Sequence, residues 1–125
     1  MDLLLDSHAL LWALSDPGRL SVRATEAIRD PGRAVFYSPA SVWELEIKVA
    51  RGKLVLPADW TDALGKTGLL ELPIASGHAV AAARLPRHHQ DPFDRMLVAQ
   101  AKLHDLQLVS RDRIFAAYAV TVLVA

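Results

Sequence analysis

Residues 89–101 read HQDPFDRMLVAQA, and this stretch organises the rest of the chain. It predicts the start of a helix, because Asp91 is a good N-cap and Pro92 suits the first helical position. Asp94 stands at the third helical position, where its carboxylate can accept a hydrogen bond from the backbone N–H of the cap residue. One face of that helix carries Asp94 followed by three apolar residues at helical spacing: Leu97, Val98 and Ala101. A carboxylate beside a core costs free energy unless a cation, a helix N-terminus or hydrogen bonds stabilise it. The stretch therefore indicates either an ordinary capping box or an acid held for function.

The composition predicts one compact domain over residues 1–125, because 52% of the residues are hydrophobic and they are spread along the chain. Lys+Arg and Asp+Glu both number 14, so the net charge is zero and the chain has no overall positive field. Any phosphate-binding surface must therefore be local. The absence of cysteine excludes disulfides and thiolate metal sites. No apolar run is long enough to span a bilayer and the first residues carry no basic leader, so we expect a cytoplasmic protein without membrane contact.

Apolar runs and helix signals alternate along the whole chain. Strands are expected at residues 3–5, 34–37, 69–72, 107–110 and 119–123, with a further extended segment at 53–56. Helices are expected at residues 8–14, 20–29, 38–51, 57–66, 76–85 and 92–104, with a short turn or helix from 113. This alternation predicts an α/β fold whose parallel or mostly parallel sheet is covered on both faces.

Acidic residues from distant parts of the chain are expected to meet at one edge of this sheet, where sites of α/β proteins form. Asp6 directly follows the first strand, and Asp112 lies just beyond the strand that follows the central helix. Asp91 and Asp94 begin that helix. Glu44 lies about 9 Å along the helix after the second strand, and its long side chain can lean toward the same edge.

Carboxylates crowded together raise each other's pKa and oppose folding unless something neutralises them. Without cysteine or a well-spaced histidine pair, such a set suits a hard divalent cation such as Mg²⁺ or Mn²⁺. These ions activate water and orient an in-line attack on a phosphodiester. The ordered acidic set therefore indicates a metal-dependent nuclease.

Each acid also has an ordinary structural interpretation. Asp6 can cap the first helix, Glu44 can pair with Lys48 four residues on, and Asp112 can be a turn residue. None of the acids is specific alone.

Four segments together resemble PIN-domain ribonucleases, and more narrowly the VapC-type toxins of bacterial toxin–antitoxin pairs: LLLDSHALLW, SPASVWELEIKVARGKL, DPFDRMLVAQA and LVSRDRIFAAYAV. The resemblance runs in the family order over nearly the whole chain and implies a single PIN domain, a three-layer α/β/α sandwich. It implies a Mg²⁺- or Mn²⁺-dependent endoribonuclease that leaves 5′-phosphate and 3′-hydroxyl ends. It also implies a homodimer and a cognate antitoxin that covers the acidic groove.

By position, the family's acidic quartet falls on Asp6, Glu44, Asp94 and Asp112. We expect Asp6 and Asp94 to bind the main ion, and Asp112 and Glu44 to hold a second ion or position the attacking water. Three further residues are expected to support them: Asp91, as the cap or an outer acid, and the hydroxyls of Ser7 and Ser110, as groups that orient ligands or water.

Basic and aromatic residues have two interpretations each. Arg95 and Arg111 adjoin the acids, so they are candidates either for RNA contact or for ion pairs with the aspartates. The residues before the central helix form a small basic cluster that fits a solvated loop or a substrate guide: Arg84, Arg87, His88 and His89. The adjacent histidines lack the spacing of a helical zinc site. Three tryptophans are expected in the core or an interface, with base stacking as an alternative for one: Trp12, Trp43 and Trp60.

Two other functions compete with the ribonuclease hypothesis. One is a PIN-like binding or scaffold module without catalysis, which the complete acidic set argues against. The other is phosphoryl transfer through Asp6 as nucleophile, but His8 stands where such enzymes need a second acid. The segment 53–60 is apolar and punctuated by Pro57, which fits contact with an antitoxin or second protomer as well as packing within the monomer.

Overall fold

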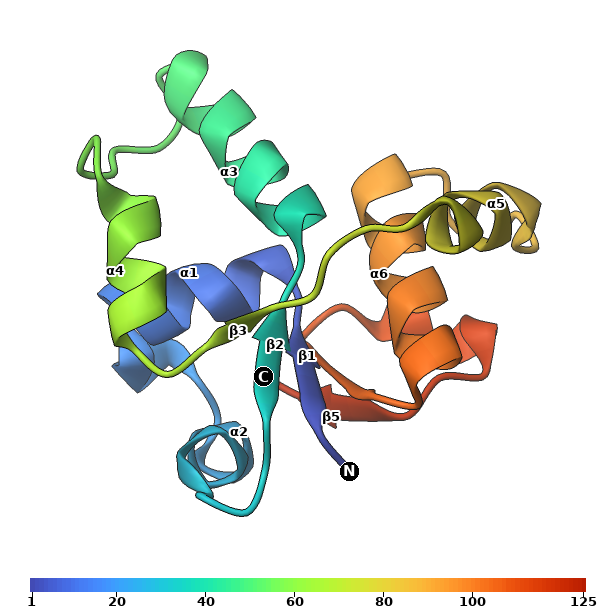
Figure 1. Ribbon diagram of the computed structural model, residues 1–125, viewed down its shortest axis with the longest axis horizontal. Helices are drawn as coiled ribbons and strands as arrows, with labels where there is room; N and C mark the ends of the chain where they lie inside the picture. The colour runs from blue at the N-terminus through green and yellow to red at the C-terminus, as the bar shows by residue number, and fades with distance from the viewer.

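A five-stranded parallel sheet forms the centre of the computed structural model, which describes residues 1–125 (Figure 1). The strands lie in the order β3 (Leu70–Glu71), β2 (Val35–Tyr37), β1 (Leu3–Leu5), β4 (Gln107–Ser110) and β5 (Val122–Val124). Every neighbouring pair is parallel. The expected mostly parallel α/β sheet is therefore confirmed.

The helices occupy the positions that the caps and apolar spacing predict, with ends shifted by a few residues. They are α1 (Ser7–Ser15), η1 (Pro17–Arg19), α2 (Val22–Arg29), α3 (Pro39–Ala50), α4 (Trp60–Lys66), α5 (Ser76–Arg84), α6 (Pro92–His104) and η2 (Arg113–Tyr118). Residues 53–56, for which an extended segment was expected, join no strand of the sheet. The last strand begins at Val122 rather than near Ala119, because Ala119 is in the left-handed conformation that ends η2.

The buried central strand β1 divides the core into two layers. Leu3 and Leu5 face one side, where they pack with residues of α1 to α4, and Leu4 faces the other. That second side is covered by α6, whose Leu97, Val98 and Ala101 are buried as the stripe predicted. Alternate side chains of a strand point to opposite faces, so three consecutive leucines serve both layers. The result is the expected three-layer sandwich, with helices on both faces of the sheet (Figure 1).

Two aspartates cap the helices at the carboxyl edge of the sheet. The Ala9 N–H donates a 2.8 Å hydrogen bond to Oδ1 of Asp6 at the start of α1. Oδ1 of Asp91 accepts hydrogen bonds from the N–H groups of Phe93 (2.8 Å) and Asp94 (3.3 Å) at the start of α6. These caps fix the starts of α1 and α6, and with them the positions of Asp6 and Asp91, at this edge of the sheet. No helix is long and apolar enough to cross a membrane.

Candidate active site

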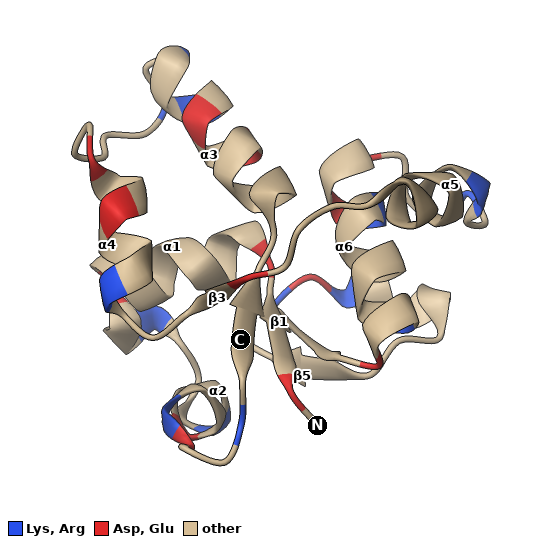
Figure 2. Cartoon of the chain, viewed as in Figure 1, with Lys and Arg blue, Asp and Glu red and all other residues tan.

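A pocket of about 280 Å³ at the carboxyl edge of the sheet collects the acids that the sequence analysis singled out. Its lining includes Asp6, Glu44, Asp91, Asp94 and Asp112. Figure 2 shows acidic segments near the starts of α1 and α6 and along α3. Residues separated by more than 100 positions in the chain therefore share one hollow, because parallel strands end at the same edge.

Asp6 is buried at the end of β1, with 5% of its surface exposed. Burial raises the pKa of its carboxyl, although hydrogen bonds from Ser110 and from the Ala9 N–H act in the opposite direction. The nearby Glu44 charge raises the pKa further. The capping interpretation of Asp6 is confirmed, and the same carboxylate also lines the pocket.

Glu44 faces the end of β1 instead of its own helix. Its Oε1 accepts a 2.5 Å hydrogen bond from the Ser7 hydroxyl, and no ion pair joins it to Lys48. The alternative i, i+4 pair is therefore wrong for this structure. The Ser7 hydroxyl thus contacts an acid of the pocket, and its role in orienting a metal ligand stays a prediction.

The Asp94 carboxylate does not form the capping-box hydrogen bond with the cap residue. Its Oδ2 lies 2.7 Å from Nε2 of His89 rather than on the backbone N–H of Asp91, so the capping-box alternative is wrong. Burial raises the pKa of Asp94 to about 6, while the His89 hydrogen bond lowers it and the charges of Asp91 and Glu44 raise it. This carboxylate is thus costly to ionise unless a cation compensates it.

Asp112 follows β4 and is the most exposed acid of the quartet. Its Oδ1 accepts a 3.0 Å hydrogen bond from the Ile114 N–H at the start of η2, so it caps this turn as the ordinary interpretation predicted. The Asp112 N–H donates to the Ser110 hydroxyl at 3.0 Å. Ser110 thereby contacts the Asp112 backbone and the Asp6 side chain, and its role in orienting ligands or water stays a prediction.

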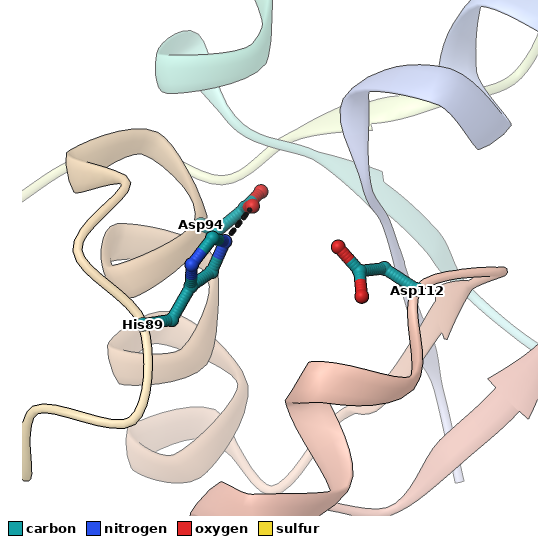
Figure 3. A group of neighbouring side chains, drawn as sticks. All are labelled: His89, Asp94 and Asp112. Atoms are coloured by element: carbon teal, nitrogen blue, oxygen red, sulfur yellow. Dashed lines mark hydrogen bonds and ion pairs between the residues drawn. The ribbon is translucent and has the colours of Figure 1, made fainter.

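His89 lines the pocket although the sequence did not single it out as a site residue; it belongs to the basic cluster for which a solvated loop and a substrate guide were both open. Its ring contacts Asp94, and one donor atom each from His89, Asp94 and Asp112 lies within 4.8 Å of the others (Figure 3). The remainder of that loop matches the expectation, since Arg84, Arg87 and His88 are exposed. The only sequence signal was a histidine two residues before the Asp91 cap.

Comparison with known proteins identifies the family of this chain. The family model described as PIN domain matches residues 3–120. The chain belongs to the PIN domain family. It is 32% identical over 114 residues to Ribonuclease VapC22 of Mycobacterium tuberculosis, covering 88% of this chain and 86% of that relative. The resemblance drawn from the four segments is thus confirmed.

Solved structures share the fold of this PIN domain. One is VapBC2 of Rickettsia felis bound to a DNA fragment from its promoter, with TM-score 0.74, 11% identity and 98% coverage of both chains. A toxin–antitoxin complex from Klebsiella pneumoniae has TM-score 0.69 and 17% identity, covering 98% of this chain and 97% of that one. FitAcB of Neisseria gonorrhoeae has TM-score 0.64 and 24% identity, with coverage of 98% and 96%.

The two arginines expected near RNA or the aspartates contact backbone carbonyls instead. The guanidinium of Arg95 donates to five carbonyl oxygens, those of Ala82, Ala83, Leu85, Pro86 and His89. That of Arg111 donates to the carbonyls of Ala125 and Arg19 and lies over the Trp12 ring. Neither arginine forms an ion pair with the aspartates, and RNA contact by Arg95 or Arg111 stays a prediction.

A second hollow of about 280 Å³ adjoins the acidic pocket and is lined by cations. It shares Glu44, Lys48 and Asp91 with the acidic pocket. Arg51 and Lys53, at the end of α3, are its other cations. None of the three cations has a carboxylate oxygen within ion-pair distance. We call Lys48, Arg51 and Lys53 the basic rim.

The tryptophans divide between core and surface. Trp60 is buried and its Nε1 donates to Glu46 at 2.6 Å, which confirms a core position. Trp43 is 64% exposed and packs edge-on against Phe93. Within the segment 53–60, Val55 is 92% exposed, so the segment packs only partly on the monomer.

Proposed function

We propose that this PIN domain is a metal-dependent endoribonuclease and the toxin of a toxin–antitoxin pair. The observation that carries the proposal is the convergence of Asp6, Glu44, Asp94 and Asp112 on one pocket. Gathering several carboxylates at one half-buried site costs free energy, as the raised pKa values of Asp6 and Asp94 indicate. The family membership and the relative named a ribonuclease support RNA as substrate.

The donor set fits Mg²⁺ or Mn²⁺, because carboxylate oxygens predominate and thiolates are absent. In the proposed mechanism, Asp6 and Asp94 hold the main ion, and Asp112 and Glu44 hold a second ion or orient the attacking water. A bound ion supplies Lewis-acid activation of that water and of the phosphodiester. Ser7 keeps the Glu44 carboxylate directed into the pocket, and Ser110 does the same for the Asp6 carboxylate while its hydroxyl accepts from the backbone N–H of Asp112.

The basic rim is proposed to hold the phosphates that flank the scissile bond. A net charge of zero and an acidic pocket give RNA no general attraction, so binding requires local cations. Lys48 lies one helical turn, about 6 Å, beyond Glu44 along α3, and Arg51 lies about 4.5 Å further. An RNA strand that leaves the pocket along α3 therefore meets successive positive charges.

A cognate antitoxin and a second copy of the chain are proposed as partners, because the structural neighbours include toxin–antitoxin complexes. The proposed site of action is the cytoplasm. Co-expression with the neighbouring open reading frame, followed by copurification, tests the first partner. Light scattering of the purified protein tests the second.

Incubation of the purified protein with labelled RNA, with and without Mg²⁺ or Mn²⁺, tests the proposed reaction. Metal-dependent cleavage to 5′-phosphate and 3′-hydroxyl ends is expected, and D94A is expected to abolish it. D105N is the control, because Asp105 is the C-cap at the opposite end of α6 from Asp94 and lies outside the pocket. Tight RNA binding without cleavage under any metal would instead favour the inactive scaffold module.

A further inference from the structure

One imidazole lies among the carboxylates of the pocket. The donor atoms of His89, Asp94 and Asp112 lie within 4.8 Å of one another, and Figure 3 shows Asp112 facing the other two from the opposite side. We infer that His89 is itself a ligand of the metal ion, through Nε2. This inference rests on the proposed metal-dependent function and adds a nitrogen donor to a site otherwise made of oxygens.

The separation of the two nearest donor atoms fits shared coordination. Nε2 of His89 and Oδ2 of Asp94 are 2.7 Å apart. Neighbouring ligands of an octahedral ion with bonds of about 2.0–2.1 Å lie about 3 Å apart. A shift of a few tenths of an ångström therefore converts the hydrogen-bonded pair into two ligands of one ion.

The backbone of His89 is anchored as a positioned ligand requires. Its N–H donates to the Tyr118 hydroxyl at 2.6 Å, and the same hydroxyl donates back to the His89 carbonyl at 3.2 Å. Arg95 donates to that carbonyl at 3.1 Å. Tyr118 is buried, so these contacts tie the loop to the core. A loop that merely carries solvated charge has no need of such anchors.

The alternative role is that of a hydrogen-bond donor that only orients Asp94. In that role the ring proton stays on Nε2. In the ligand role the ion replaces the proton at Nε2, and a neutral ring carries its single proton on Nδ1 after exchange with solvent. The two roles therefore differ in whether Nε2 of His89 binds the metal or donates its proton to Asp94.

A nitrogen ligand changes which ion the site prefers. Imidazole is a softer donor than carboxylate, and a divalent transition-metal ion, even Mn²⁺ at the start of the series, takes a nitrogen ligand more readily than Mg²⁺ does. We expect the protein to bind Mn²⁺ more tightly than Mg²⁺, and the difference to shrink in H89Q. Mn²⁺ affinity is expected to fall at least tenfold in H89Q, in line with the loss of a group that holds a metal site.

The test is pulsed electron paramagnetic resonance of the full chain loaded with Mn²⁺ and labelled with ¹⁵N-histidine. A directly bound histidine nitrogen gives a coupling that changes with the label. This coupling is expected in the wild type, in H8Q and in H88Q, and absent in H89Q. His8 is the informative control because it lines the same pocket, whereas His88 is the exposed neighbour. Calorimetric titration of Mn²⁺ and Mg²⁺ gives the affinities.

The outcomes separate this inference from the proposed function. Bound Mn²⁺ without histidine coupling, together with normal RNA cleavage, overturns the ligand role and leaves the ribonuclease proposal standing. Coupling that disappears in H8Q assigns the nitrogen to His8 and also overturns it. No binding of either ion overturns both proposals. If H89Q does not fold, persistence of the coupling in both H8Q and H88Q still supports His89.

Discussion

The Ser7 hydroxyl donates a 2.5 Å hydrogen bond to Oε1 of Glu44, and this bond joins the start of α1 to α3 across 37 positions of sequence. It directs Glu44 into the acidic pocket and away from Lys48. The bond is thus a long-range contact that supports the site rather than local helix stability.

Replacement of Ser7 by alanine is expected to lower cleavage by about 10- to 100-fold, because Glu44 loses the group that orients it. The free energy of unfolding is expected to fall by about 1 kcal/mol for the lost hydrogen bond. S7T keeps the hydroxyl and should retain most activity. S15A removes an exposed hydroxyl bonded only to the Leu11 carbonyl and should leave cleavage unchanged. Equal rates for S7A and S15A would contradict the role of Ser7.

Asparagine at Asp6 or Asp94 is expected to abolish cleavage while leaving the metal-free fold equally or more stable. Asn caps helices about as well as Asp, and the change removes mutual repulsion from the pocket. Chemical denaturation without metal, alongside the cleavage assay, checks both parts. A stability loss above about 1 kcal/mol in both variants would mean that the carboxylates serve mainly as structural groups.

The metal-free protein is expected to lose stability relative to D94N as pH rises from about 4 to above 6. The folded-state pKa of Asp94 is about 6, raised from an ordinary value of 3.8, so between these values the folded state holds a proton that the unfolded state has released. This bound proton stabilises the folded state fully below the ordinary pKa, and the stabilisation is lost as pH rises through the folded-state pKa. The loss in the free energy of unfolding is on the order of 2 kcal/mol. Saturating Mn²⁺ should abolish the difference between the wild type and D94N in the slope of stability against pH. Denaturation curves at several pH values measure it, and parallel curves for the two proteins would refute it.

Neutralising the basic rim in K48Q/R51Q/K53Q is expected to weaken RNA binding. The slope of log K against log salt concentration should become shallower by about two units, since each lost phosphate contact to a single strand contributes about 0.7. KM should rise while kcat on saturating RNA stays close to wild type. The matched control is R29Q/K66Q/K102Q, which removes three cations outside both hollows. An equal change in both triple variants would assign the effect to net charge alone.

Arg95→Met is expected to destabilise the fold by about 2–3 kcal/mol, because carbonyls at the end of α5 and in the following loop lose a charged donor. Lysine cannot reproduce the planar set of donors and should rescue only part of the loss. Thermal unfolding measures the effect. R84M, an exposed arginine on α5, should be near neutral. A soluble, stable R95M with impaired RNA binding would restore the direct RNA contact first expected of this residue.

Local chemistry in the sequence determined the elements and the acids. The caps at Asp6, Ser21 and Asp91 set helix starts, and the leucines of β1 predicted a strand buried on both faces. These signals involve neighbours along the chain, so they are readable without a fold. Alternation of strands and helices then implied that the acids meet at one edge, since parallel strands end together.

Only the tertiary structure decided which partner each polar side chain takes. Glu44 contacts Ser7 rather than Lys48, Arg95 binds carbonyls, and His89 turns to Asp94 because Tyr118 and Arg95 hold its loop. Spacing along the chain restricts the reach of a side chain but does not choose among partners within that reach. The choice depends on how distant loops pack at the sheet edge, which is a property of the whole fold.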